Sequence, residues 1–188
     1  LEVNHGPTLI DNNLMLSAAS VRNQSQGVAF VHNLIAGQIL MWSEPNRFTP
    51  YHLPHSTEVA GLSTIYSGDD RYYNNILLEC DQKLNNRNTR FNFGIQGYDN
   101  AKIPVSIDGN VYYTGSVHYE KETNYVENKG FNPELKIIEE DGQIYLQFSL
   151  DDLFFNQKNQ LVTTELLGKA KIPKQAFENS DGTPLQID

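Results

Sequence analysis

Short apolar runs separated by polar corners dominate the chain, and helical periodicity is almost absent. Four of these runs lie next to an asparagine, at Asn13, Asn33, Asn75 and Asn110. The spacings between them are 20, 42 and 35 residues, which we interpret as one repeat, two repeats, and one repeat with an insertion. A unit of about twenty residues with a short strand and a corner asparagine is typical of a parallel β-solenoid.

Asparagine suits the corner of such a coil because it tolerates the left-handed backbone conformation. Its side-chain amide can also bond to the same residue one coil away, so that we expect a stacked asparagine ladder. We assign residues 1–115 to the coils. Two longer excursions, 41–55 and 81–100, interrupt them. Loops that leave a rigid solenoid on one side commonly build its binding face.

The pattern changes from residue 116 onward. Asp141-Gly142 lies between two alternating apolar runs, which predicts a β-hairpin. Residues 161–167 and 169–172 are expected to be further antiparallel strands, and 174–179 one turn of helix after Pro173. The predicted fold class is therefore all-β: parallel β-helix coils followed by antiparallel strands. We interpret 116–188 as part of a β-sandwich that is incomplete without strands from upstream.

Composition narrows the possible partners. The 188 residues include 14 Lys plus Arg and 23 Asp plus Glu, a net charge of −9. An acidic chain gains no counterion-release energy from a phosphate backbone, so nucleic acid is not an expected partner, whereas a neutral sugar is not disfavoured. Cys80 is the single cysteine, which excludes a disulfide framework and fits either a cytoplasmic enzyme or a bacterial secreted one. The sequence does not fix the compartment, and of the two we expect a bacterial cytoplasmic protein. No apolar run approaches the roughly 18 residues that a membrane span needs.

Glu2 is the candidate catalytic residue. Equivalent side chains on neighbouring coils lie about 4.8 Å apart, and retaining glycosidases need two carboxyl groups about 5–5.5 Å apart. A coil that presents Glu2 outward therefore has the geometry for retaining hydrolysis if a second carboxylate lies one coil upstream or downstream. The alternative is a solvated Glu2 without a chemical role.

A second cluster, His52, His55 and Glu58, suggests a metal site or a polar clamp on a substrate. Pro54 excludes the helix that would place both histidines on one face, which disfavours zinc, and we expect no metal or cofactor. Hydrogen bonds to sugar hydroxyls, or a loop of mutually bonded polar residues, fit better. Glu58 precedes Val59 as Glu2 precedes Val3, which predicts that the two carboxylates face the same way on different coils.

Aromatic residues in the first excursion are candidates for sugar binding. Trp42 and Tyr51 could stack on a sugar ring, although packing is the more common role of such residues. Asn4 is included among the candidate substrate contacts because it lies two residues from Glu2.

Several of these motifs together resemble glycoside hydrolase family 120, a family of β-xylosidases. They are Glu2-Val3-Asn4-His5-Gly6-Pro7 with Asp11-Asn12-Asn13, Ser25-Gln26-Gly27 with His32-Asn33-Leu34, Pro50-Tyr51-His52 with Pro54 to Gly61, Gly68-Asp69-Asp70-Arg71 with Tyr73-Asn74-Asn75, and Leu161 to Gly168. The resemblance implies a right-handed parallel β-helix intermixed with a β-sandwich, and an oligosaccharide substrate. It covers the C-terminal part of the family's length.

The resemblance also implies a role for Glu2 and the position of its catalytic partner. Glu2 matches the general acid/base of the Glu-Val-Asn-His-Gly-Pro motif, and the family's Asp nucleophile, about one coil earlier, falls before Leu1. We therefore expect this chain to need the N-terminal part of the same protein as its partner and to be inactive alone. The charge and the motifs do not determine the oligomeric state, and a homo-oligomer is one possible assembly.

Two other functions stay open from the residues alone. A non-catalytic carbohydrate-binding β-helix module would bind oligosaccharides without hydrolysing them. A polysaccharide lyase would need clustered aspartates for calcium and a basic residue, for which Asp69-Asp70-Arg71 is the candidate.

Overall fold

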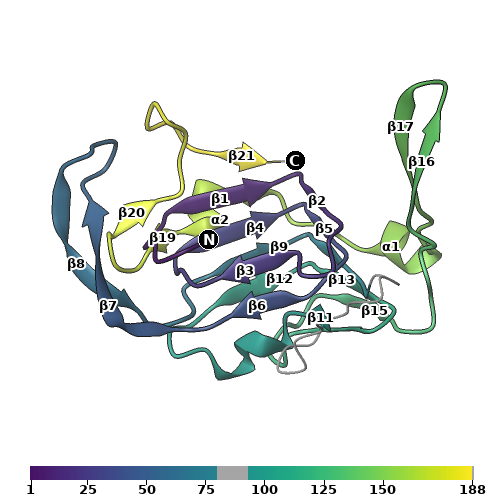
Figure 1. Cartoon of the computed structure of the whole chain (residues 1–188), viewed down its shortest axis with the longest axis horizontal. Helices are drawn as coiled ribbons and strands as arrows, with labels where there is room; N and C mark the ends of the chain where they lie inside the picture. The colour runs from purple at the N-terminus through teal and green to yellow at the C-terminus, as the bar shows by residue number, and fades with distance from the viewer. Residues whose placement is uncertain (80–92, 188) are drawn as a thin grey trace.

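The structure is a computed structural model that describes residues 1–79 and 93–187, and its regular elements are mostly strands. Two sheets are parallel throughout (Figure 1). The first has the order β1 (Thr8–Asp11), β4 (Val28–Val31), β9 (Arg71–Tyr73), β12 (Ser106–Asp108). The second has the order β15 (Val126–Asn128), β13 (Val111–Tyr113), β10 (Ile76–Leu77), β5 (Leu34–Ile35), β2 (Leu14–Met15). The prediction of an all-β fold is confirmed.

A third set of parallel strands completes the first circuits of the chain. β3 (Val21–Asn23) pairs with β6 (Ile39–Met41), and a parallel bridge joins Glu2 to Gln24 on the other side of β3. The chain therefore runs from this third sheet to the first, then the second, and back again. The parallel stacking continues to β15, which lies beyond the boundary that we expected at residue 115.

The interior between the sheets is filled by side chains that occupy the same position on successive paired strands. Ile10, Phe30, Tyr72 and Ile107 are successive partners across the first sheet, and all belong to one apolar cluster or pack against it. The rings of Phe30 and Tyr72 stack with centroids 4.6 Å apart. Side chains of adjacent coils thus pack on one another at the strand spacing, which is why aromatic and β-branched residues recur here.

The predicted asparagine ladder is present. Asn33, Asn75 and Asn110 are buried. The backbone N–H and side-chain Nδ2 of Asn33 donate to Asn75 Oδ1, and those of Asn75 donate to Asn110 Oδ1, at 2.9–3.0 Å. The ladder ends on the buried carboxylate of Glu122, which accepts from Asn110 Nδ2 at 2.8 Å and from Tyr112 Oη at 2.5 Å. Residues of positive φ precede the ladder asparagines, as the corner requires: Asn12, His32, Asn74 and Gly109.

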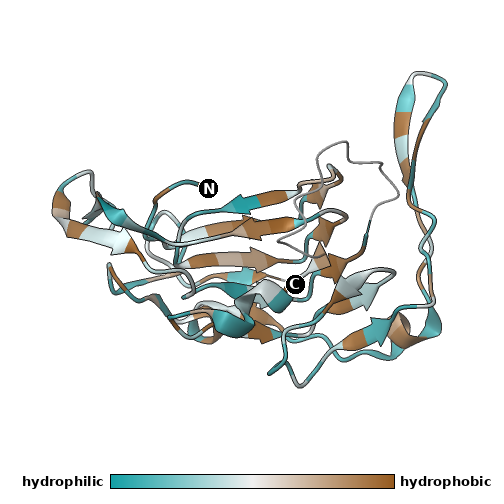
Figure 2. Cartoon of the chain, turned by 60° about the horizontal axis from the view of Figure 1, so that its bottom comes forward, coloured by the Kyte–Doolittle hydropathy of each residue, from teal (hydrophilic) through white to brown (hydrophobic). Residues whose placement is uncertain are grey.

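The outer faces of the first two sheets are covered by the C-terminal third of the chain. Ala29 and Val31 of the first sheet pack against Val162, Leu167 and Phe177, among others. The outer face of the second sheet packs against Phe131, Leu135, Leu146, Leu150 and Phe154. Figure 2 shows apolar residues on the stacked strands of the body. Both faces of these sheets are thus buried, as is usual for parallel sheets.

Two antiparallel hairpins project from this body (Figure 1). β16 (Lys136–Glu140) and β17 (Gln143–Gln147) form the predicted Asp-Gly hairpin, with positive φ at Asp141 and Gly142. β7 (Glu44–His52) and β8 (Val59–Ile65) form the other. Because β4 pairs directly with β9, the 42 residues from Asn33 to Asn75 are one circuit with this hairpin inserted. The interpretation of that spacing as two repeats was wrong.

The C-terminal region differs from expectation in its local elements. Residues 174–179 are not helical: Lys174 lies in a turn with φ 58°, followed by β20 (Gln175–Ala176). The strand expected at 161–167 is shortened to β18 (Val162–Thr163), because α2 (Thr164–Leu167) begins where the Thr163 side chain accepts from Leu166 N. The remaining elements are α1 (Asp152–Asn156), β19 (Lys169–Ala170) and β21 (Gln186–Ile187).

The β-sandwich stays a prediction, since the antiparallel strands between 129 and 187 form separate pairs: β16 with β17, β18 with β21, β19 with β20. Of the excursion expected at 81–100, residues 81–92 lie outside the described residues, as does Cys80. Its described part holds β11 (Phe93–Gly94), which pairs with β14 (Ser116–Val117), and the 3-10 helix Gln96–Asn100. Within 1–79 and 93–187, no helix has the length and apolar character that crossing a membrane demands.

A carboxylate, Asp70, is buried inside the coils. It accepts hydrogen bonds from Asn23 Nδ2 and Tyr98 Oη, both at 2.9 Å, and from Val28 N at 3.0 Å. Burial raises the pKa of Asp70 to about 7, although the bonds from Val28 and Tyr98 act in the opposite direction. The protonated form is therefore favoured by folding.

This buried carboxylate contributes stability that is larger at pH 5 than at pH 8. A folded-state pKa above the unfolded value stabilises the fold at low pH, and the contribution disappears as the pH rises through about 7. The expected loss is about 2 kcal/mol in the free energy of unfolding between these two pH values. Urea unfolding across the range measures it, and Asp70→Asn, which cannot titrate, should reduce the slope. An unchanged slope in that variant would exclude Asp70 as its source.

Candidate active site

Glu2 lies on the outer face of the third sheet, and its side chain is 61% exposed. Its nearest charged partner is Arg47 of β7, with Nη1 3.4 Å from Glu2 Oε1. Glu2 bridges to Gln24, and the register of β3 with β6 continues to Trp42, whose N–H donates to Asn23 O. Glu2, Gln24 and Trp42 are therefore equivalent positions on three successive coils. The downstream neighbour of Glu2 is an amide, so the downstream coil supplies no second carboxylate at this position.

The strand that carries Glu2 has one paired side and one open side. Its bonds to the next coil run from Val3 N to Gln24 O and from Gln24 N to Leu1 O. In a parallel ladder this pattern leaves the N–H and C=O of Glu2 pointing away from Gln24. Among residues 1–79 and 93–187, no partner is recorded for these two groups. The side of Glu2 opposite Gln24 is thus the place where a further strand could pair.

Polar and aromatic side chains continue from Glu2 along this face. Gln24 Nε2 donates to Glu44 Oε2 at 3.1 Å, and Arg22 Nη2 donates to Gln24 Oε1 at 3.4 Å. The Arg22 guanidinium lies over the Trp42 ring, 5.0 Å from its centroid. We call Arg22, Gln24, Trp42, Glu44 and Arg47 the outer strip. It offers an aromatic surface, guanidinium donors and a carboxylate next to Glu2, which are groups that bind sugar hydroxyls.

Asn4 and His5 hold the turn that follows Glu2. Asn4 Oδ1 accepts from Gly6 N at 2.6 Å, and Asn4 Nδ2 donates to Thr8 Oγ1 at 3.1 Å. These bonds hold the Asn4 side chain within its own turn in this structure.

His5, which the sequence reasoning did not select, anchors the β7–β8 hairpin to this turn. It is buried, its Nδ1 lies 2.9 Å from Gln26 Nε2, and its Nε2 lies 2.9 Å from Thr49 Oγ1 of β7. Burial lowers the pKa of His5, so the neutral ring is favoured. Because an amide nitrogen can only donate, Nδ1 accepts and Nε2 carries the proton. Tyr51 packs edge-on against His5, with ring centroids 5.9 Å apart.

The three residues of the second cluster lie at the far end of the hairpin. His55 Nε2 is 2.9 Å from Glu178 Oε1, and the His52 carbonyl accepts from the Gln175 side chain. Glu58 N donates to Ser56 Oγ at 3.0 Å. Glu58 is in the connection between β7 and β8, not on a coil, so the expectation that it faces the same way as Glu2 was wrong. Among residues 1–79 and 93–187, no hydrogen bond or ion pair joins this cluster to Glu2.

The candidate calcium site is occupied by internal contacts. Arg71 Nη1 lies 2.8 Å from Asp69 Oδ1, both side chains are buried, and Asp70 bonds inward to Asn23 and Tyr98. Within the part of the chain that the structure describes, no three His, Cys, Asp or Glu side chains are grouped as a metal site would require. These residues therefore act as structural contacts.

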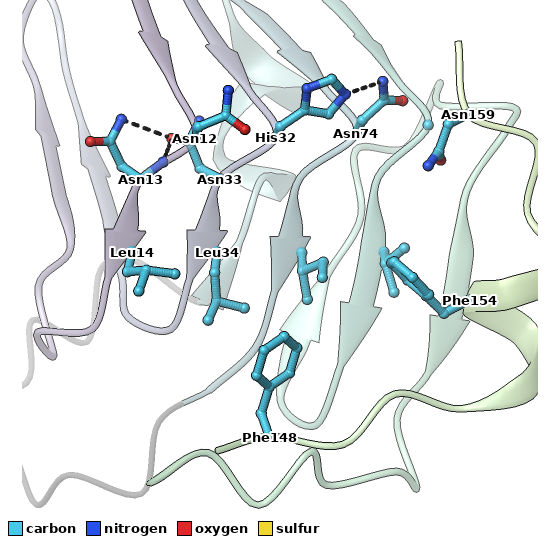
Figure 3. Close-up of a pocket in the computed structure, with 13 residues that line it drawn as sticks. Asn12, Asn13, Leu14, His32, Asn33, Leu34, Asn74, Phe148, Phe154 and Asn159 are labelled. Carbon is cyan, nitrogen blue, oxygen red and sulfur yellow. Dashed lines mark hydrogen bonds between the residues drawn. The ribbon is translucent and has the colours of Figure 1, made fainter. Parts of the chain in front are cut away.

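A separate hollow of about 380 Å³ lies over the second sheet. Figure 3 shows Asn12, His32 and Asn74 in a row above Leu14 and Leu34, with Phe148 and Phe154 opposite. Its lining contains no carboxylate, and its corner residues bond to one another, as in the 2.9 Å contact of His32 Nε2 with Asn74 Nδ2. Carboxylates lie instead at Glu2 and at Glu44 of the outer strip.

Comparison with known proteins gives one solved structure that resembles this chain. No family model matches the chain, and no curated protein matches it. The solved structure is that of XylC in complex with xylose, with a TM-score of 0.89 and 36% sequence identity. The match covers 100% of this chain and 32% of XylC, so the chain spans about a third of the length of this neighbour. The chain therefore shares the fold of that part of XylC.

Proposed function

We propose that this chain is the C-terminal part of a retaining β-xylosidase of glycoside hydrolase family 120, acting on xylo-oligosaccharides. The observation that carries the proposal is Glu2, an exposed carboxylate at the open edge of stacked parallel strands, in a chain 36% identical over its full length to a protein solved with xylose. The alternating parallel sheets support a right-handed parallel β-helix as the fold. We further propose that the antiparallel segments complete a β-sandwich with strands from the N-terminal part of the same protein.

Glu2 acts as the general acid/base in this proposal. It protonates the glycosidic oxygen as the leaving group departs, and it then removes a proton from the water that releases the sugar. The nucleophile is an aspartate on the preceding coil, which would pair along the open side of Glu2. Stacked strands are about 4.8 Å apart, close to the 5–5.5 Å separation of carboxyl groups in retaining enzymes.

Substrate contacts are proposed in two places. Trp42 shares the row of Glu2, and the exposed Arg22 guanidinium lies over one face of its ring. Trp42 is proposed to stack on a sugar ring. His52, His55 and Glu58, on the exposed end of the β7–β8 hairpin, are proposed to bond to hydroxyls of a longer oligosaccharide. Tyr51, which packs against His5, and Asn4, in the turn after Glu2, are proposed as further substrate contacts.

The test is an assay of the full-length polypeptide that carries this chain, with xylobiose and xylotriose as substrates. Release of xylose from the non-reducing end supports the proposal. Saturable binding of both oligosaccharides without hydrolysis would favour a carbohydrate-binding module instead. A product with a double bond, detected by its absorbance and abolished by a chelator, would favour a lyase.

A further inference from the structure

The outer strip lies on the side of Glu2 where the next coils follow. If the proposed function holds, the side of Glu2 on which a group lies decides whether it contacts the leaving group or the xylosyl unit. In a retaining displacement the nucleophile attacks the anomeric carbon from the face opposite the leaving oxygen, and the general acid donates to that oxygen. The acid therefore lies toward the leaving group, and the nucleophile lies on the other side of the scissile bond.

The strand pairing shows which side of Glu2 would hold the nucleophile and which would hold the leaving group. The open edge, where the nucleophile's coil would pair, is on the side to which the N–H and C=O of Glu2 point. Gln24 and Trp42 follow on the opposite side, one and two coils away. Since each coil adds about 4.8 Å, Trp42 is about 10 Å from Glu2 along the coil axis, a span that accommodates one sugar ring.

The chemistry of the strip fits such a ring. Trp42 offers an aromatic ring, and the exposed Arg22 guanidinium lies over one face of it, 5.0 Å from the centroid, with donors beyond the one that binds Gln24. Gln24 is buried, and its amide is fixed by Arg22 on one side and Glu44 on the other. A fixed polar base next to an aromatic ring is the usual arrangement for binding a pyranose, with its C–H face on the ring and its hydroxyls on the donors.

We propose that Arg22, Gln24 and Trp42 form the subsite for the leaving-group sugar, and that this subsite takes a pyranose as the leaving group. Arg22 and Trp42 contact the sugar, whereas Gln24 is a positioning residue that orients Arg22. This inference rests on the proposed function. It adds that the leaving-group sugar extends from Glu2 toward Gln24 and Trp42. It places the xylosyl unit to be transferred on the other side of Glu2.

The experiment compares two substrates of the full-length polypeptide. Xylobiose has a sugar as its leaving group, and β-xylosyl fluoride has fluoride, which is too small to use the subsite. Trp42→Ala should lower kcat/KM for xylobiose about tenfold and change kcat/KM for the fluoride less than twofold, because a stacking contact is lost only with the sugar. Arg22→Ala should act in the same direction. Phe48→Ala removes an exposed ring of β7 outside the strip and should change neither value.

Each outcome is informative. An equal loss for both substrates would overturn the subsite, because the residue would then support the xylosyl site or the fold. No change for either substrate in the Trp42 and Arg22 variants would also overturn it. If the unaltered polypeptide hydrolyses neither substrate, the proposed function fails, and the subsite with it. Activity on the fluoride that persists in Trp42→Ala shows that the variant is folded.

Discussion

Glu2→Ala is expected to reduce kcat/KM of the full-length polypeptide for xylobiose by about 10²- to 10⁴-fold, the range that general acid–base catalysis supplies. A sugar leaving group needs a proton, and Glu2 is the proposed source. β-Xylosyl fluoride needs none, so its first step should be affected much less. Steady-state kinetics with both substrates measure the difference. The second step, release of the sugar by water, also loses its base and should become rate-limiting for the fluoride.

Azide separates this role from simple disruption of the site. A small anionic nucleophile needs no general base, so it should restore turnover of the fluoride in Glu2→Ala and yield xylosyl azide. Glu139→Ala, at an exposed carboxylate of the β16–β17 hairpin, serves as a matched control and should keep full activity. Full activity of Glu2→Ala on xylobiose would end the assignment of Glu2. Loss of activity without recovery in azide would contradict its role as acid/base.

Asn75→Ala should produce the largest loss of stability among substitutions in the ladder. Asn75 is fully buried, and its Oδ1 accepts two bonds from Asn33, while its Nδ2 donates to Phe30 O and Asn110 Oδ1 at 2.9 Å. Alanine leaves several buried groups without partners, each at a cost of about 1–3 kcal/mol. We expect the free energy of unfolding to fall by about 3–5 kcal/mol, measured by urea unfolding.

Asn13→Ala is the matched control because it is the same substitution at the exposed end of the same ladder. Asn13 donates to Asp11 O and Asn33 Oδ1, but water can replace the lost partners at this position. Its expected cost is about 1 kcal/mol or less. Equal losses for the two substitutions would contradict the view that burial, and not the bonds alone, makes the ladder important.

The sequence predicted the ladder and the Asp-Gly hairpin because both depend on local chemistry. A recurring asparagine and Asp-Gly between alternating runs need few residues to be recognised, and the ladder of Asn33 and Asn75 and the turn at Gly142 are present. The left-handed conformation, however, belongs to the residue before each ladder asparagine, such as His32 and Asn74. The insertion between Asn33 and Asn75 was misinterpreted because spacing alone does not distinguish two coils from one coil with a hairpin. β7 and β8 pair with one another, and only the pairing of β4 with β9 reveals it.

The candidate site was predictable only in part. Glu2 was identified from its motif and its outward position, but Arg22, Gln24 and Arg47 were not, because they come together across coils and across the hairpin. His5 was missed although it lies in the same motif; its role depends on Thr49, which is 44 positions away in the sequence. The helix expected at 174–179 failed because Lys174 adopts a turn conformation before β20.

The stereochemistry of the first product tests the central claim most directly. The claim is that Glu2 and a carboxylate one coil away stand at the spacing of stacked strands, which leaves no room for water between them and the sugar. Proton NMR of the full-length polypeptide acting on β-xylosyl fluoride distinguishes the anomers before they equilibrate. β-Xylose as the first product is the predicted result, since two inversions restore the configuration. α-Xylose as the first product would require a wider pair of carboxyl groups and would contradict the account.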